Sequence, residues 1–149
     1  MLDTDLVGDA FPEAPLAVAP TATIGETLRV LKQHRHGSVL VCEDGQLLGI
    51  FTERDALKRM AGGGSLDAAV ADVMTPRPVT VSRRDTVGEA IRRMANGGYR
   101  HLPVVDDEGR PTGIVSVRGI LHYLVEHFPS LVYTLPPNPH HRPHDREGA

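Results

Sequence analysis

Thr52 and Asp55 are the pair of residues whose types and spacing are best suited to holding a charged small molecule. They follow the apolar run 47–51, and the pattern predicts that a strand ends and a helix begins at this point. Free backbone N–H groups and the helix dipole favour an anion at such a helix start. Elsewhere in the chain, Arg100 offers a charged fork for a phosphate. Its neighbour His101 adds a donor whose charge varies near neutral pH.

The same pair also has a purely structural interpretation. A Ser or Thr followed three residues later by an acidic residue forms a capping box, which closes the first turn of a helix and needs no ligand. On spacing alone the capping box is the favoured interpretation of Thr52 and Asp55, and a binding motif is the alternative. Both interpretations stay open at this point.

Other candidate sites in the sequence are weaker. His140, His141 and His144 lie in a Pro-rich stretch without Cys, so we expect solvated side chains rather than a metal site. The sequence has no Gly-x-Ser-x-Gly elbow, no Walker loop and no Gly-x-Gly-x-x-Gly turn, which are common signatures of catalytic and nucleotide-hydrolysing sites. We therefore predict that the protein is not an enzyme and has no catalytic cofactor and no metal.

The chain repeats itself. Residues 22–28 (ATIGETL) are matched by residues 85–91 (DTVGEAI), and residues 43–52 (EDGQLLGIFT) by residues 107–116 (DEGRPTGIVS). An internal repeat means that one supersecondary unit occurs twice. Two copies of one unit explain the chain better than one irregular domain.

Each unit has the pattern of strand, helix, strand, strand, helix. Thr23 and Thr86, each followed three residues later by Glu, predict capping boxes at the first helix of each unit. Apolar residues at helical spacing follow them, and acidic-Gly turns between β-rich runs indicate hairpins. The predicted strands are 16–18, 39–42, 47–51, 79–81, 101–105 and 113–115, and the predicted second helices are 53–61 and 117–127, with a short helix at 67–73 between the units.

These elements predict an α/β (α+β) fold of two β-α-β-β-α repeats. A single unit of this size would leave one face of its small sheet uncovered, so we expect the two copies to pack as one pseudo-symmetric module. The predicted organisation is an N-terminal segment (1–9), repeat one (10–62), a linker with a short helix (63–71), repeat two (72–128) and a Pro/His-rich tail (129–149). We expect the tail to be a mobile extension.

Residues 10–128 resemble the cystathionine β-synthase (CBS) repeat, which occurs in tandem as the Bateman module. Residues 49–55 (GIFTERD) fit its Gly-apolar-x-Thr/Ser-x-x-Asp nucleotide motif, and residues 72–75 (DVMT) and 99–106 (YRHLPVVD) fit other parts of its pattern. The resemblance implies a non-catalytic regulatory module that binds AMP, ADP, ATP or another adenosyl ligand. A ligand-free dimerisation or protein-interaction scaffold is the alternative.

The resemblance also implies roles for individual residues. Asp55 would hold the ribose hydroxyls, Thr52 the phosphate, and Arg100 and His101 would complete the phosphate pocket from the other repeat. In the second copy Gly119 stands in place of the Asp, so we expect one nucleotide per chain. The predicted ligand-binding residues are Leu16, His36, Thr52, Arg54, Asp55, Tyr99, Arg100, His101, Pro103 and Arg118.

Composition limits the remaining possibilities. The chain has 149 residues, of which 40% are hydrophobic and 23% charged, with a net charge of −3 and no basic run, so we expect neither nucleic-acid nor membrane binding. The single cysteine, Cys42, lies in an apolar run, which predicts a small buried core residue. The lone cysteine and the acidic N-terminus favour the cytoplasm. The apolar residues of 117–127 predict a homodimer, and a regulated partner protein would be a further ligand of the module.

Overall fold

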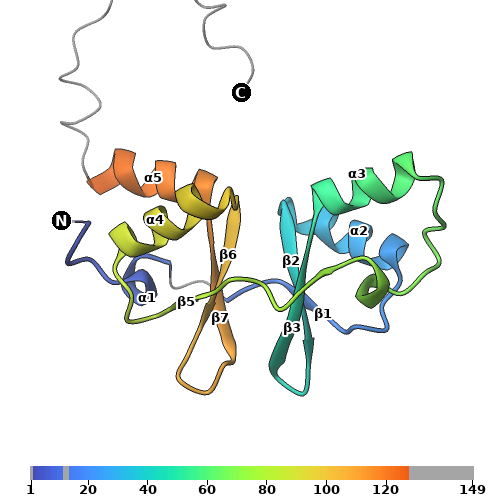
Figure 1. Ribbon diagram of the computed structural model, residues 1–149, viewed down its shortest axis with the longest axis horizontal. Helices are drawn as coiled ribbons and strands as arrows, with labels where there is room; N and C mark the ends of the chain where they lie inside the picture. Colours follow the sequence, from blue (N-terminus) through green and yellow to red (C-terminus); the bar gives the residue numbers. More distant parts are fainter. Residues whose placement is uncertain (1, 12–13, 128–149) are drawn as a thin grey trace, which may run out of the picture. The chain divides into compact units, whose positions relative to one another are not determined.

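The computed structural model describes residues 2–11 and 14–127. The described residues divide into two compact units, one that ends at Val117 and one that begins at Arg118. The described residues form five α-helices and two small sheets, whose course along the chain can be followed in Figure 1. The predicted tail and its three histidines lie outside the described residues.

The first repeat has the predicted order of elements, and its strands are those of a mixed sheet. β1 runs parallel to β2, and β2 runs antiparallel to β3 with Val39 opposite Phe51. A tight turn at Asp44 and Gly45, both with positive φ, joins these two strands, as the acidic-Gly signal predicts. The elements are β1 (Ala17–Val18), α2 (Ile24–His34), β2 (Ser38–Glu43), β3 (Gln46–Thr52) and α3 (Glu53–Ala61).

The segment between the repeats adds a fourth strand to this sheet. The predicted short helix is the three-residue 3-10 helix η1 (Val70–Asp72), and β4 (Thr75–Pro76) follows it. β4 pairs antiparallel with β3, with Pro76 opposite Gly49. The sheet order is therefore β1-β2-β3-β4. A proline is tolerated in β4 because this strand is at the edge of the sheet.

The second repeat has the same order of elements as the first. β5 runs parallel to β6, and β6 antiparallel to β7, which gives a three-stranded sheet in the order β5-β6-β7. The predicted fold class, with two β-α-β-β-α repeats, is thus confirmed. The elements are β5 (Val81–Ser82), α4 (Val87–Gly97), β6 (His101–Val105), β7 (Pro111–Ser116) and α5 (Val117–His127).

At the helix starts Thr23 and Thr86, only one of the two hydrogen bonds of a capping box is formed. The Thr23 hydroxyl accepts a hydrogen bond from the Glu26 N–H over 3.0 Å, and Thr86 accepts one from the Glu89 N–H over 3.1 Å. The returning bond of a capping box is not formed at either start, so this part of the prediction is wrong. The Glu89 carboxylate instead accepts from Arg92 and Arg93, because these cations lie three and four residues farther along the same helix.

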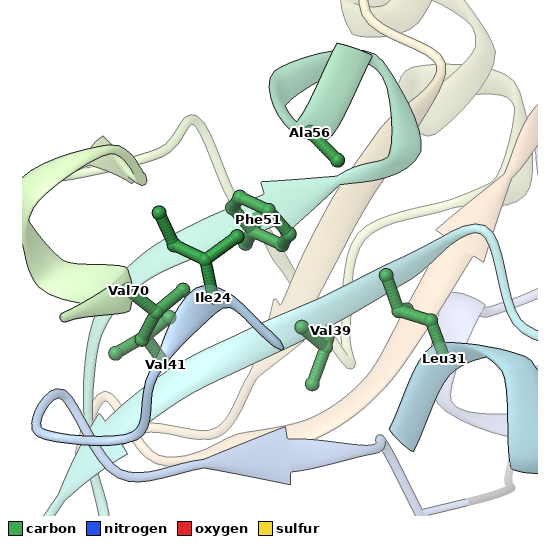
Figure 2. Close-up of a cluster of buried hydrophobic side chains, with 7 residues drawn as sticks. All are labelled: Ile24, Leu31, Val39, Val41, Phe51, Ala56 and Val70. Carbon is green, nitrogen blue, oxygen red and sulfur yellow. The ribbon is translucent and has the colours of Figure 1, made fainter. Parts of the chain in front are cut away.

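A cluster of aliphatic side chains and one phenylalanine forms the core of the first repeat (Figure 2). Its members come from the strands β2 and β3, the helices α2 and α3, and η1. Cys42, predicted as a core residue, is only half-buried, and burial raises the pKa of its thiol. The buried residues are Ile24, Leu31, Val39, Val41, Phe51, Ala56 and Val70.

The N-terminal segment contains a four-residue helix, α1 (Val7–Ala10), that the sequence pattern does not predict. Its chain is bound to the helix start of the second repeat: Leu6 forms a bridge with Thr86, and the Val87 N–H donates to the Asp5 carbonyl. The segment 66–70 makes the same contacts with the first repeat. Ala69 forms a bridge with Thr23 there. Two equivalent segments therefore support the two equivalent helix starts.

Among the described residues, no helix combines the length and the apolar character that crossing a membrane requires.

Candidate functional site

Thr52 and Asp55 form a complete capping box at the start of α3. The Asp55 Oδ2 atom accepts hydrogen bonds from the Thr52 backbone N–H over 2.9 Å and from the Thr52 hydroxyl over 3.1 Å. The Thr52 hydroxyl oxygen lies 3.2 Å from the Asp55 N–H, which donates to it. Both side chains are half-buried. The prediction of a capping box is therefore confirmed. The other carboxylate oxygen, Asp55 Oδ1, receives no hydrogen bond from the described part of the chain.

His101 is the first residue of β6 in the second repeat. It lies beside the start of α3, which belongs to the first repeat. A Cβ atom built on Gly37 would be 3.1 Å from Glu53 Oε1 and 3.4 Å from His101 Nε2. Burial lowers the pKa of His101 below its ordinary value of 6.5, while the charge of Glu53 opposes this shift and that of Arg100 adds to it. The structure thus brings one of the predicted phosphate-binding residues next to the first residue after Thr52.

Glu53 was not among the residues selected from the sequence. Its N–H donates to the Gly37 carbonyl over 3.1 Å, which fixes the first turn of α3 against the loop before β2. The signal in the sequence was its place inside the motif, directly after Thr52. Nothing in the spacing shows that its side chain turns toward Gly37 and His101.

The equivalent contact in the second repeat has different chemistry. There the Val117 N–H donates to the Arg100 carbonyl over 3.0 Å, so Val117 occupies the place of Glu53 and Arg100 the place of Gly37. At these two positions one repeat has a glutamate and a glycine, and the other a valine and an arginine. The two helix starts are therefore alike in backbone and different in charge.

Arg100 and Tyr99 lie on the surface before β6. Both side chains are exposed, Tyr99 to 41%, and the Tyr99 ring covers Gly97 so closely that a Cβ atom there would collide with it. His36 in the first repeat is also exposed, and its ring meets that of His34 edge-on with centroids 6.4 Å apart. These side chains are free to approach a ligand from solvent.

Leu16 and Pro103 are apolar members of the predicted site. Leu16 is half-buried and packs against the core of the first repeat, and its carbonyl accepts from the Leu40 N–H over 2.9 Å. Pro103 is buried in β6 opposite Ile114. Because β5 pairs only with Val104 and Val105, the missing N–H of Pro103 does not interrupt that ladder.

Arg54 and Arg118 occupy equivalent positions in α3 and α5, and both are exposed. Arg118 belongs to the second compact unit, which leaves its predicted approach to the phosphate as a prediction. A cavity of about 310 Å³ lies elsewhere, where α1 meets the turns at Arg83 and Asp107. The chemistry-bearing residues of the predicted site do not line that cavity.

The fold and the repeat agree with the CBS domain family. The family model for the CBS domain matches residues 7–62 and 70–126. The chain therefore belongs to this family, as a tandem pair of CBS domains.

Two relatives illustrate the sequence similarity. An uncharacterised 17.7 kDa protein of Acidianus ambivalens is 36% identical over 110 residues, which cover 73% of this chain and 66% of that protein. The CBS domain-containing protein YhcV of Bacillus subtilis is 34% identical over 112 residues, 74% of this chain and 79% of that protein. The chain spans about two thirds of the length of the first of these relatives.

Solved structures show the same fold. A CBS-domain protein of Agrobacterium tumefaciens has a TM-score of 0.73 and 36% identity, over 78% of this chain and 97% of that one. A CBS domain protein of Pyrobaculum aerophilum, complexed with AMP, has a TM-score of 0.74 and 26% identity, over 81% and 98% of the two chains. The CBS domain pair of protein MJ0100, in complex with 5′-methylthioadenosine and S-adenosyl-L-methionine, has a TM-score of 0.73 and 26% identity, over 78% and 97%.

Proposed function

We propose that this protein is a non-catalytic regulatory module that binds an adenine nucleotide, AMP, ADP or ATP, and acts as an energy or ligand sensor. The observation that carries the proposal is the position of His101. This residue of the second repeat lies beside Gly37 and Glu53 of the first, at the helix start that follows the motif residue Thr52. A donor from the second repeat therefore lies beside the helix start of the first, which supports a site made by both repeats.

The proposed roles follow from the chemistry of each group. Asp55 has an Oδ1 atom that receives no bond from the described residues, and a carboxylate accepts well from a ribose hydroxyl. The N-terminus of the nine-residue helix α3 favours an anion, and Arg100 and His101 supply donors. Leu16, His36, Arg54, Tyr99, Pro103 and Arg118 would surround the remainder of the ligand.

The solved relatives support this chemistry. One is complexed with AMP, and another with S-adenosyl-L-methionine and 5′-methylthioadenosine. All three ligands contain an adenosyl group and differ in the substituent on the ribose 5′ carbon. We therefore infer that this chain has a site for the adenosyl group that these ligands share.

A ligand-free dimerisation scaffold is the second candidate, because one observation favours it. The capping box of Thr52 and Asp55 is complete without a ligand, so the pair has a structural reason to be present. In this case the CBS fold would serve through its surfaces alone.

Calorimetric titration of the wild type and Asp55→Asn with AMP, ADP, ATP and S-adenosylmethionine separates the two candidates. Asn keeps an oxygen that can accept from the Thr52 N–H, so the cap and the ligand-free melting temperature should change little. A hydrogen bond to a charged group contributes about 1.5–3 kcal/mol, so affinity should fall roughly ten- to a hundred-fold. Wild-type protein should bind one ligand per chain.

Asp67→Asn is the matched control, since Asp67 is exposed and only its backbone N–H makes a bond, to Ser65. It removes the same charge and should leave affinity unchanged. Wild-type protein that is free of carried-over ligand and binds none of these compounds would support the scaffold instead. The homodimer, a regulated partner protein and a cytoplasmic location belong to the same proposal.

A further inference from the structure

The carboxylate of Glu53 lies where the proposed site should meet the ligand's phosphates. Its Oε1 atom is 3.1 Å from the Cβ position of Gly37, and His101 Nε2 is 3.4 Å from the same point. The absence of a side chain on Gly37 leaves room for the carboxylate to come this close. The carboxylate of this exposed side chain thus lies near the imidazole that the proposal assigns to phosphate.

The backbone keeps Glu53 at this place. The N–H of Glu53 donates to the Gly37 carbonyl over 3.1 Å, and the preceding Thr52 is held by both bonds of its capping box. A carboxylate in the first turn is also favoured by the helix dipole. Val117, the equivalent residue of the second repeat, is apolar, so the fold itself does not require a charge here.

We propose that Glu53 is a specificity-determining residue that selects ligands by the charge of their 5′ substituent. Its charge repels phosphate, so it weakens the binding of ATP and ADP more than that of AMP, and it strengthens the binding of a cationic substituent. This inference rests on the proposed adenosyl site and adds a ranking of its ligands. The electrostatic effect of Glu53 on His101 is consistent with a carboxylate that acts across this short gap.

The test is the effect of Glu53→Gln on the affinities for adenosine, AMP, ADP, ATP and S-adenosylmethionine. Removing one charge near a partly solvated phosphate should strengthen AMP binding on the order of threefold to tenfold relative to adenosine. The gain should increase from AMP to ADP to ATP. The affinity for the cationic S-adenosylmethionine should fall, and that for adenosine should stay within about twofold.

Glu43→Gln is the matched control, because Glu43 is an exposed residue at the far end of β2. It makes the same change in net charge and should leave the ranking of ligands unchanged. An AMP-to-adenosine ratio that is the same in the wild type and Glu53→Gln would overturn the inference, as would an equal shift in Glu43→Gln. If adenosyl ligands bind and depend on Asp55 but show no charge-graded shift, only this inference fails. If neither protein binds any of them, the proposed function fails with it.

Discussion

Val7 and Val70 occupy equivalent places at the helix starts of the two repeats, and both are fully buried. The Val7 N–H donates to the Asp85 carbonyl over 2.8 Å, and the Val70 N–H donates to the Ala22 carbonyl over 2.7 Å. Val7 precedes the first repeat in the chain but is bound to the second. Val70 precedes the second repeat but is bound to the first. Each repeat therefore depends on a segment that lies outside its own run of strands and helices.

We expect Val7→Ala to lower the free energy of unfolding by about 2 kcal/mol, because it removes two fully buried methyl groups and leaves a cavity. Chemical denaturation followed by circular dichroism measures this change. Val79→Ala is the matched control, since Val79 is 41% exposed and its truncation should cost less than about 0.5 kcal/mol. Equal effects of the two substitutions would show that the N-terminal segment contributes nothing to the core.

We expect Gly49→Ala to destabilise the first repeat by about 1–3 kcal/mol. An added Cβ would be 2.8 Å from the Thr75 carbonyl oxygen and 2.5 Å from Met74 Sδ, so β4 would have to move away from β3. Thermal unfolding and amide exchange of the β4 residues measure the effect.

Gly25→Ala provides the comparison for Gly49→Ala. An added Cβ at Gly25 in α2 would meet the Leu66 carbonyl oxygen at 3.5 Å, an ordinary contact. Alanine has the higher helix propensity, by up to about 1 kcal/mol, so this variant should be neutral or more stable. A tolerated Gly49→Ala would contradict the close approach of β4.

The repeat made most of the fold predictable from the sequence. The two second helices, Glu53–Ala61 and Val117–His127, have the predicted bounds, because a strand ends in Thr or Ser directly before each of them. The helix α1 and the strand β4 were missed. They have four and two residues, which is too short for a hydrophobic period, and their places depend on tertiary contacts with Thr86 and Gly49.

The candidate site was predictable in composition and less so in geometry. The motif indicated Thr52 and Asp55, and the structure shows that they bind each other. Their local spacing is compatible with a cap and with a site, so sequence could not decide between these roles. The position of Glu53 depends on the path of the loop at Gly37, which no local pattern encodes.

We expect Leu121→Glu to convert the proposed homodimer into a monomer. Leu121 and Val125 are one helical turn apart in α5 and are 58% and 43% exposed, and a charge in an apolar interface is costly to desolvate. Sedimentation velocity at micromolar concentrations measures the change. Val79→Glu places the same charge at an exposed Val outside the helices and should leave the dimer intact. A monomeric wild type would refute the dimer.

We expect His101 to make the protein less stable in mild acid. Burial lowers its pKa in the folded state below 6.5, with Glu53 opposing and Arg100 assisting the shift. Between the two pKa values the unfolded chain binds more protons than the folded chain, so the unfolding free energy falls as pH decreases through 6.5. Above pH 6.5 His101 is neutral in both states and causes no loss of unfolding free energy. Below its folded-state pKa the loss has reached its full size.

His101→Gln should remove this part of the pH dependence, because glutamine does not titrate. The measurement is the free energy of unfolding by urea at intervals between pH 8 and pH 5, compared between wild type and variant. His36→Gln, at an exposed imidazole, should keep the wild-type profile. A His101→Gln profile parallel to that of the wild type would contradict the lowered pKa of His101, and would mean that the attraction of Glu53 offsets the effect of burial on the imidazole.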